Sequence, residues 1–303
     1  MKHNLSVTVI LLITFLLAQF IGLFVLYNYI DPVKSEELGK TSFKELPVGE
    51  RPQIEEKTSF VPVIISILIG TGVLLLLIKY SLDWIWKLWF LIALTISLTM
   101  VFGVFVPWQI AFGLALVLGI WKIWKPNFWI QNITELLVYG GLAAIFVPLF
   151  NLWSMSILLI FIVGYDAYAV WKSKHMVTLA QSQIKSKVFS GLLIPYKMGK
   201  MAGSKMKSAK NSVTASKSAS SVPVKVRTAI LGGGDIGFPL LFAGVIMKEI
   251  GLWQSLLIPF FALGGLAFLL WYGDEKKFYP AMPFISAGCF VGLGVVGVVS
   301  LLV

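Results

Sequence analysis

The segment Ile157-Leu-Leu-Ile-Phe-Ile-Val-Gly-Tyr-Asp166-Ala-Tyr-Ala-Val-Trp171 places an aspartate inside an apolar run typical of a membrane-spanning helix. A second aspartate, Asp235, lies in the segment Leu231-Gly-Gly-Gly-Asp235-Ile-Gly-Phe-Pro-Leu240. A charged side chain at the centre of a bilayer costs about 2.5 to 3.5 kcal/mol on insertion scales, so an ionisable group there is expected to have a function. Two such residues suggest a pair of carboxylates within the membrane.

The composition around these segments is that of a polytopic membrane protein. Of 303 residues, 58% are hydrophobic and only 13% are charged, whereas about 25% of residues are charged in soluble domains. A single cysteine, Cys289, excludes a disulfide framework and a cysteine metal site, and we expect neither a metal nor another cofactor. Much of the net charge of +11 comes from residues 171–227, which contain many Lys and Arg but no acid. Basic residues beside membrane spans contact lipid headgroups, so we expect no nucleic-acid partner.

Apolar stretches along the chain predict an all-α polytopic membrane protein with nine transmembrane helices. The expected spans cover residues 6–29, 59–79, 85–106, 108–121, 133–150, 153–172, 228–247, 252–272 and 280–302. We therefore expect an N-terminal half with six spans, residues 1–172, and a C-terminal half with three, residues 228–303.

Residues 173–227 are expected to form a basic cytoplasmic loop between the halves. Residues 176–201 mix apolar side chains with lysines, which fits either an amphipathic segment at the lipid headgroups or a helical extension of the sixth span. Residues 202–221 are rich in Ser, Ala and Lys, and they cannot bury enough apolar surface to offset the entropy of ordering. They predict a disordered linker.

The positions of Lys and Arg predict the orientation in the membrane, because short cytoplasmic loops carry an excess of these residues. Lys2 precedes the first span, and the second, fourth, sixth and eighth connections are basic, whereas the third and fifth are uncharged. The N-terminus is therefore expected in the cytoplasm, and the C-terminus on the outer side of the cell membrane.

The two aspartates have similar expected depths. Asp166 lies about six residues before the cytoplasmic end of its span and Asp235 about eight after the start of the next, at about 1.5 Å per residue. Two close carboxylates in a low-dielectric site share one proton, so one can act as a base and the other as an acid. Such a pair can activate water for attack on a peptide carbonyl, as in aspartic proteases.

The glycines before Asp235 fit this chemistry. Gly232, Gly233 and Gly234 each weaken a helix by about 1 kcal/mol, which is expected where the backbone must open or be approached closely. An extended substrate could pair with such an open backbone edge by strand addition. The alternative is that the glycines serve close helix packing, which we expect of Gly288 and Gly292, spaced four residues apart.

One further acid, Glu135, follows Asn132-Ile133-Thr134 at the expected cytoplasmic start of the fifth span. There its carboxylate could reach the membrane surface or interact favourably with the helix N-terminus. We therefore expect it to have a structural role.

Three motifs together resemble those of presenilin and signal peptide peptidase, the GxGD-type intramembrane aspartyl proteases. They are Tyr165-Asp166 in the sixth span, Gly232-Gly233-Gly234-Asp235 in the seventh, and Pro280-Ala281-Met282 at the start of the ninth. Their order and spacing match across essentially the whole chain. Met282 stands where the family has Leu, a volume-conserving difference.

The resemblance implies a presenilin-like fold and an intramembrane aspartic endopeptidase with Asp166 and Asp235 as the catalytic pair. It also implies that Pro280, Ala281 and Met282 shape the active site and that Tyr165 supports its aspartate. The expected substrates are transmembrane-helix proteins, including remnant signal peptides, that have their N-terminus outside. The compact length suggests a microbial, archaeal-type homologue that needs no partner subunits, and the oligomeric state and any self-cleavage within 202–221 are left open.

Two other functions could also use a pair of intramembrane aspartates. A transporter or ion channel could use the two aspartates as proton or cation sites, although no inverted repeat is visible. A prepilin peptidase would also carry a Gly-x-Gly-Asp motif, but it would not explain Pro280-Ala281-Met282.

Overall fold

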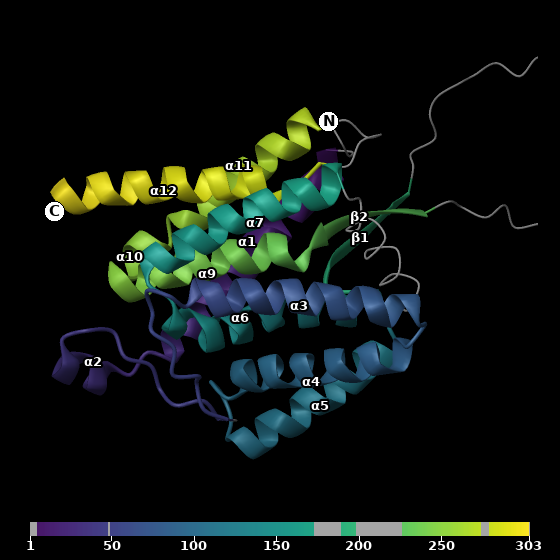
Figure 1. Ribbon diagram of the computed structural model, residues 1–303, viewed down its shortest axis with the longest axis horizontal. Coiled ribbons are helices and arrows are strands. Elements are labelled where there is room, and N and C mark those ends of the chain that lie inside the picture. Colours follow the sequence, from purple (N-terminus) through teal and green to yellow (C-terminus); the bar gives the residue numbers. More distant parts are fainter. Residues whose placement is uncertain (1–4, 48, 173–188, 198–225, 274–278, 303) are drawn as a thin grey trace, which may run out of the picture.

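In its described residues the protein is a helical bundle with a short two-stranded sheet at one end (Figure 1). The computed structural model describes residues 5–47, 49–172, 189–197, 226–273 and 279–302. The expected linker at 202–221 lies outside these residues, as does most of the loop around it.

Before the basic loop, the regular elements among the described residues are all helices. They are α1 (Leu5–Asn28), α2 (Pro32–Leu38), α3 (Phe60–Lys79), α4 (Asp83–Phe102), α5 (Trp108–Trp124), α6 (Phe128–Phe146), the 3-10 turn η1 (Val147–Leu149) and α7 (Leu152–Trp171). The connection after α1 adds an isolated β-bridge between Ile30 and Phe43. The sheet and the C-terminal helices follow: β1 (Gly191–Lys197), β2 (Val226–Gly232), α9 (Gly233–Glu249), α10 (Leu252–Ser255), α11 (Ile258–Tyr272) and α12 (Met282–Leu302).

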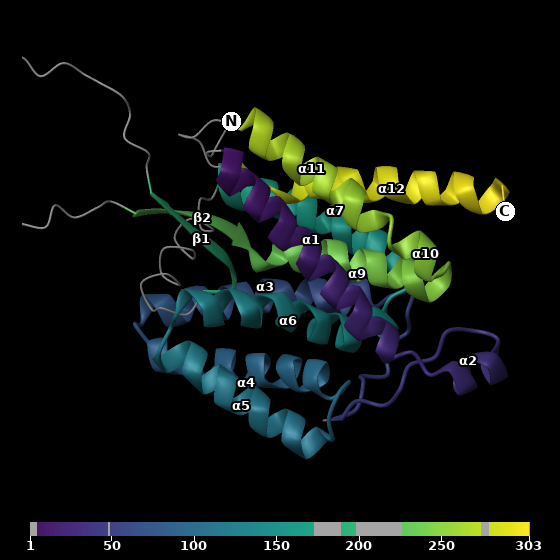
Figure 2. The same cartoon turned by 180° about the vertical axis from the view of Figure 1, so that it is seen from behind.

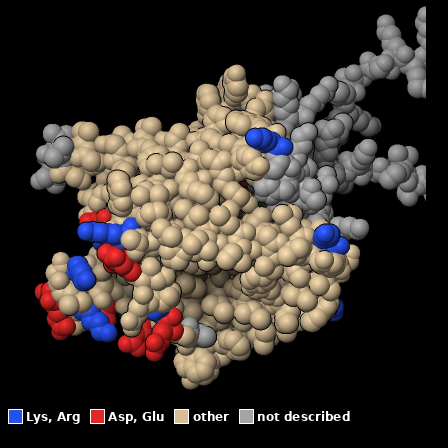
Figure 3. All heavy atoms as spheres, viewed as in Figure 1, with Lys and Arg blue, Asp and Glu red and all other residues tan. Residues whose placement is uncertain are grey.

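Seven helical segments among the described residues are long and apolar enough to cross a membrane. The helices α5 and α9 have 17 residues each and are shorter than the usual span of about 20. The polytopic class is confirmed, and the count of nine spans stays a prediction. The charged residues on one face gather mainly around α2, while a broad area elsewhere is uncharged, as lipid contact requires (Figure 3).

The short sheet corrects two expectations. The expected seventh span, residues 228–247, begins with the strand β2, and residues 191–197, expected to be amphipathic or helical, form the strand β1. The strands pair antiparallel, with Gly191 opposite Gly232. Leu192 and Ile194 are buried while Leu193 between them is partly exposed, a period of two that indicates a strand. A count of apolar residues alone does not detect this alternation.

The helix α9 occupies the middle of the bundle. It contacts α1, α6, α7, α11 and α12, and α1 crosses it on the side seen in Figure 2. Ten of its residues are buried, whereas α3 has no buried residue and contacts mainly α4 and α7. The central position of α9 places its first turn, which carries Asp235, inside the protein.

Close packing of α11 against α12 depends on glycine. A Cβ atom at Gly288 would lie 2.2 Å from the carbonyl oxygen of Phe261, and one at Gly292 would lie 3.1 Å from Phe261 Cβ. The packing role expected of these two glycines is confirmed.

Candidate active site

Asp166 lies on α7, and its side chain reaches the start of α12. The backbone N–H of Met282, the first residue of α12, donates a hydrogen bond to Asp166 Oδ2 at 3.1 Å. Asp166 is 5% exposed and Met282 is 3% exposed. The first N–H groups of a helix have no partner within the helix, and the helix dipole favours an anion there. The Pro280-Ala281-Met282 segment therefore meets the first aspartate directly.

Asp235 lies in the first turn of α9 and is 9% exposed. Gly232, the last residue of β2, has extended backbone angles, so the chain passes from strand to helix within one residue. A Cβ atom at Gly232 would lie 3.2 Å from Asp235 Oδ2, so the carboxylate folds back over the glycine segment. Both aspartates are thus buried beside a helix N-terminus, on helices α7 and α9 that contact each other.

The three glycines before Asp235 differ in what surrounds them. A Cβ atom at Gly233 would lie 2.8 Å from Ser190 Oγ and 2.9 Å from the Tyr139 hydroxyl, so no side chain fits there without movement. At Gly234 the nearest neighbour, on Phe238, would be 3.6 Å away, which is ordinary contact. Gly233 is therefore the glycine required for close approach.

Tyr165 points toward a different helix. Its hydroxyl donates to Thr71 Oγ1 on α3 at 3.1 Å, and its ring stacks on that of Phe161. The residue expected to support Asp166 therefore joins the helix of Asp166 to the otherwise loosely held α3.

The sequence matches the family of signal-peptide peptidase and presenilin aspartyl proteases over residues 21–303. The chain belongs to this family. It is therefore an intramembrane aspartic endopeptidase and an integral, multi-pass membrane protein. A direct comparison with curated proteins gives no match.

The fold agrees with this membership. The chain is similar to a solved structure of a presenilin family intramembrane aspartate protease in space group C222, with a TM-score of 0.62 and 16% identity over 96% of this chain and 99% of that one. A second structure with the same description, in space group P2, gives a TM-score of 0.58 and 17% identity over 95% and 96%. At this identity the likeness concerns the fold alone.

In this presenilin-family chain the carboxylate of Glu135, for which the sequence predicts a structural role, lies in the protein interior. Glu135 is 1% exposed and pairs with Lys122 in the last turn of α5. The hydroxyl of Tyr139 donates to its second carboxylate oxygen. The sequence shows that Glu135 and Lys122 lie near span ends, but not that their helices bring them together inside the protein.

Sequence reasoning also missed Gln19. This fully buried residue of α1 donates from Nε2 to the carbonyl oxygen of Ile236 at 2.8 Å, one residue after Asp235. The sequence does carry a signal, because Gln19 is a polar amide within the apolar first span, but unlike Asp166 and Asp235 it is not ionisable. Within the described residues, no group of three or more His, Cys, Asp or Glu side chains could hold a metal ion.

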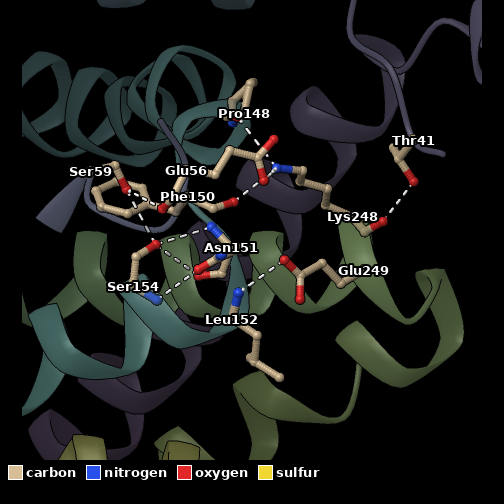
Figure 4. Close-up of polar contacts among 10 residues, drawn as sticks. All are labelled: Thr41, Glu56, Ser59, Pro148, Phe150, Asn151, Leu152, Ser154, Lys248 and Glu249. Carbon is tan, nitrogen blue, oxygen red and sulfur yellow. Dashed lines mark hydrogen bonds and ion pairs between the residues drawn. The ribbon is translucent and has the colours of Figure 1, made fainter. Parts of the chain in front are cut away.

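The other end of α9 is fixed by a network of polar contacts (Figure 4). Lys248 Nζ donates to Glu56 Oε2 at 2.7 Å and to the carbonyl oxygen of Phe150 at 2.9 Å. Thr41 Oγ1 donates to the backbone carbonyl of Lys248 at 2.6 Å. These bonds join α9 to the connection after α1 and to the joint between α6 and α7.

Proposed function

We propose that Asp166 and Asp235 are the catalytic dyad of this protease and that they hydrolyse peptide bonds within or near the transmembrane helices of membrane proteins, including remnant signal peptides. The observation that carries the proposal is the bond from the Met282 N–H to Asp166 Oδ2. It joins two of the three sequence motifs, and the third motif begins the helix α9 that packs against α7.

Because both carboxylates are buried, one can act as the base while the other acts as the acid. Two nearby carboxylates in a low-dielectric site hold one proton between them. The ionised carboxylate takes a proton from water, which attacks the substrate carbonyl carbon, while the protonated one donates to the carbonyl oxygen. The roles then reverse, and a proton is delivered to the leaving amine as the C–N bond breaks. The chain's own carboxylates supply every proton transfer.

The sheet offers a means of presenting substrate. A peptide bond within a helix has its carbonyl group hydrogen-bonded, so the substrate must be extended locally before attack. One edge of β2 pairs with β1, and the other makes no backbone hydrogen bond among the described residues. The outer edge of β1 is covered, because the Asn132 side chain bonds both the N–H and the C=O of Leu193 at 2.9 Å. A substrate strand added to β2 runs toward Asp235, three residues after Gly232.

The topology supports the expected division of the chain. Residues 1–172 and 228–303 each contribute one carboxylate, and 173–227 connect them as a basic cytoplasmic loop. The described start of α1 lies at the sheet end of the bundle, and α12 ends at the opposite end (Figure 1). This supports a cytoplasmic N-terminus, an external C-terminus and substrates with an external N-terminus. The single chain contains both carboxylates, so the proposed chemistry takes no catalytic group from a partner subunit.

The proposal is tested by cleavage of a single-span substrate reconstituted in liposomes with the purified protein. We expect Asp166→Asn and Asp235→Asn each to lower the rate by about 10³-fold or more, because either change removes one member of the acid–base pair. The matched control is Asp83→Asn, since Asp83 also lies in the first turn of a helix, α4, but is exposed. Retention of activity in either site variant would contradict the dyad.

A further inference from the structure

A stripe of buried polar side chains follows one face of α6 toward the candidate active site. Gln131, Glu135 and Tyr139 are spaced four residues apart, which places them one above another on a helix. Lys122 joins the stripe from α5, and all four residues are buried. The sequence predicts a structural role for Glu135 and assigns none of the four residues to the active site.

The stripe centres on the carboxylate of Glu135. Lys122 Nζ donates to Glu135 Oε1, and the Tyr139 hydroxyl donates to Oε2. Lys122 also lies 5.3 Å from the centre of the Phe90 ring, a favourable position for a cation over an aromatic face. Both oxygens of Glu135 are therefore occupied, and the hydroxyl of Tyr139 is held in one position.

The side chain of Tyr139 contacts the first two turns of α9. Its hydroxyl oxygen lies 2.9 Å from where a Cβ atom of Gly233 would be, and its ring carbon Cδ1 lies 3.8 Å from that of Gly237. These glycines are two residues before and two residues after Asp235. The tyrosine side chain therefore packs on the backbone at both sides of the candidate catalytic residue.

The same part of α6 also holds the sheet. Gln131 Nε2 donates to the carbonyl oxygens of Phe189 at 2.8 Å and Gly191 at 3.1 Å. Gly191 begins β1 and pairs with Gly232, the residue that joins β2 to α9. One helix face thus contacts the strand pair and the turn that carries Asp235.

We propose that Lys122, Glu135 and Tyr139 are positioning residues that fix the first turn of α9, and with it the carboxylate of Asp235, relative to the β1–β2 edge. This inference rests on the proposed function of Asp235. Stability alone does not explain a buried ion pair, because apolar replacements of similar volume are often neutral or stabilising. Reaction rate, by contrast, depends on the position of a catalytic group to within a fraction of an ångström.

The test uses Tyr139→Phe, which keeps the ring against the glycines and removes only the hydroxyl. We expect kcat for the reconstituted substrate to fall about tenfold while KM changes by less than about twofold. The matched control is Tyr29→Phe. The Tyr29 hydroxyl is also buried and donates to the Met100 carbonyl at 2.7 Å, but Tyr29 directly follows the C-terminal end of α1. An unchanged kcat in Tyr139→Phe, or an equal fall in Tyr29→Phe, overturns the inference.

A second variant replaces the ion pair as a whole. Lys122→Met alone leaves a buried charge without its partner and is expected to fold poorly, whereas Lys122→Met with Glu135→Leu removes both charges and keeps the volume apolar. We expect this double variant to fold with an unchanged unfolding midpoint but a kcat lowered at least as much as in Tyr139→Phe. A folded double variant with normal kcat would show that the pair is structural only. Asp235→Asn is measured alongside, since activity in that variant contradicts the proposed dyad rather than the positioning.

Discussion

Both ends of α9 carry charged groups, buried at the N-terminal end and partly buried at the C-terminal end, and the groups are arranged differently. At the C-terminal end, Lys248 is paired with the opposite charge of Glu56 and with a backbone carbonyl. At the N-terminal end, Asp235 follows three glycines, and the helix packs against α7, which carries a second acid, Asp166. Opposite charges stabilise the first arrangement, whereas the proposed pairing of Asp166 with Asp235 brings together two like charges, which cannot both ionise without cost. The difference suggests that one end serves stability and the other catalysis.

The largest contrast is expected within the glycine segment itself. Gly233→Ala introduces a Cβ atom 2.8 Å from Ser190 Oγ, while Gly234→Ala meets nothing closer than 3.6 Å. We expect Gly233→Ala to lower kcat about 100-fold, because a displacement near 1 Å at a catalytic group has about that effect. Gly234→Ala should stay within several-fold of the wild type. Equal rates for the two variants, measured on the same liposome substrate, would remove Gly233 from the site.

At the opposite end the expected effect is on stability. Lys248→Met leaves the Phe150 carbonyl and Glu56 without this donor. We expect the free energy of unfolding to fall by about 2 kcal/mol, and not by more because Glu56 is partly exposed to solvent. The folded fraction should retain its kcat. Thermal unfolding in detergent measures the first quantity, with exposed Lys125→Met as the control. A kcat that falls as far as in Gly233→Ala would contradict the separation of roles.

The smallest effects come from two side chains that each donate to a backbone carbonyl of α9. Gln19 donates to Ile236 near the aspartate, and Thr41 donates to Lys248 at the other end. Gln19→Leu and Thr41→Val should each cost about 1 kcal/mol of stability, the usual net contribution of one hydrogen bond. Only Gln19→Leu should also lower kcat, by several-fold. Identical kinetics in the two variants would show that the carbonyl of Ile236 needs no fixing for catalysis.

Much of the helical framework could be predicted from the sequence. A run of about 20 apolar residues specifies a spanning helix without knowledge of its neighbours. The bounds of α1, α3 and α7 accordingly differ from the expected spans by one residue at each end or less. The same reasoning fails where local pattern and total hydrophobicity disagree, because the apolar residues of β2 resemble the start of a spanning helix when only apolar residues are counted.

The sequence predicts those residues of the candidate site whose insertion into a membrane costs free energy. An aspartate within an apolar run is conspicuous, so Asp166 and Asp235 could be found, and their glycine and proline motifs strengthened the assignment. Glu135 and Lys122 could not be placed, because each lies near a span end where water would be accessible to it. Only the packing of α5 on α6 makes them a buried pair.

The most direct test of the account is a structure of the protein with a bound peptide mimic that carries a hydroxyl group in place of the scissile carbonyl. We expect that hydroxyl to lie about 2.5 to 3.0 Å from one carboxylate oxygen of Asp166 and from one of Asp235. The peptide backbone should continue along the outer edge of β2. A hydroxyl that contacts only one of the two aspartates, or a peptide bound away from both, would contradict the central claim.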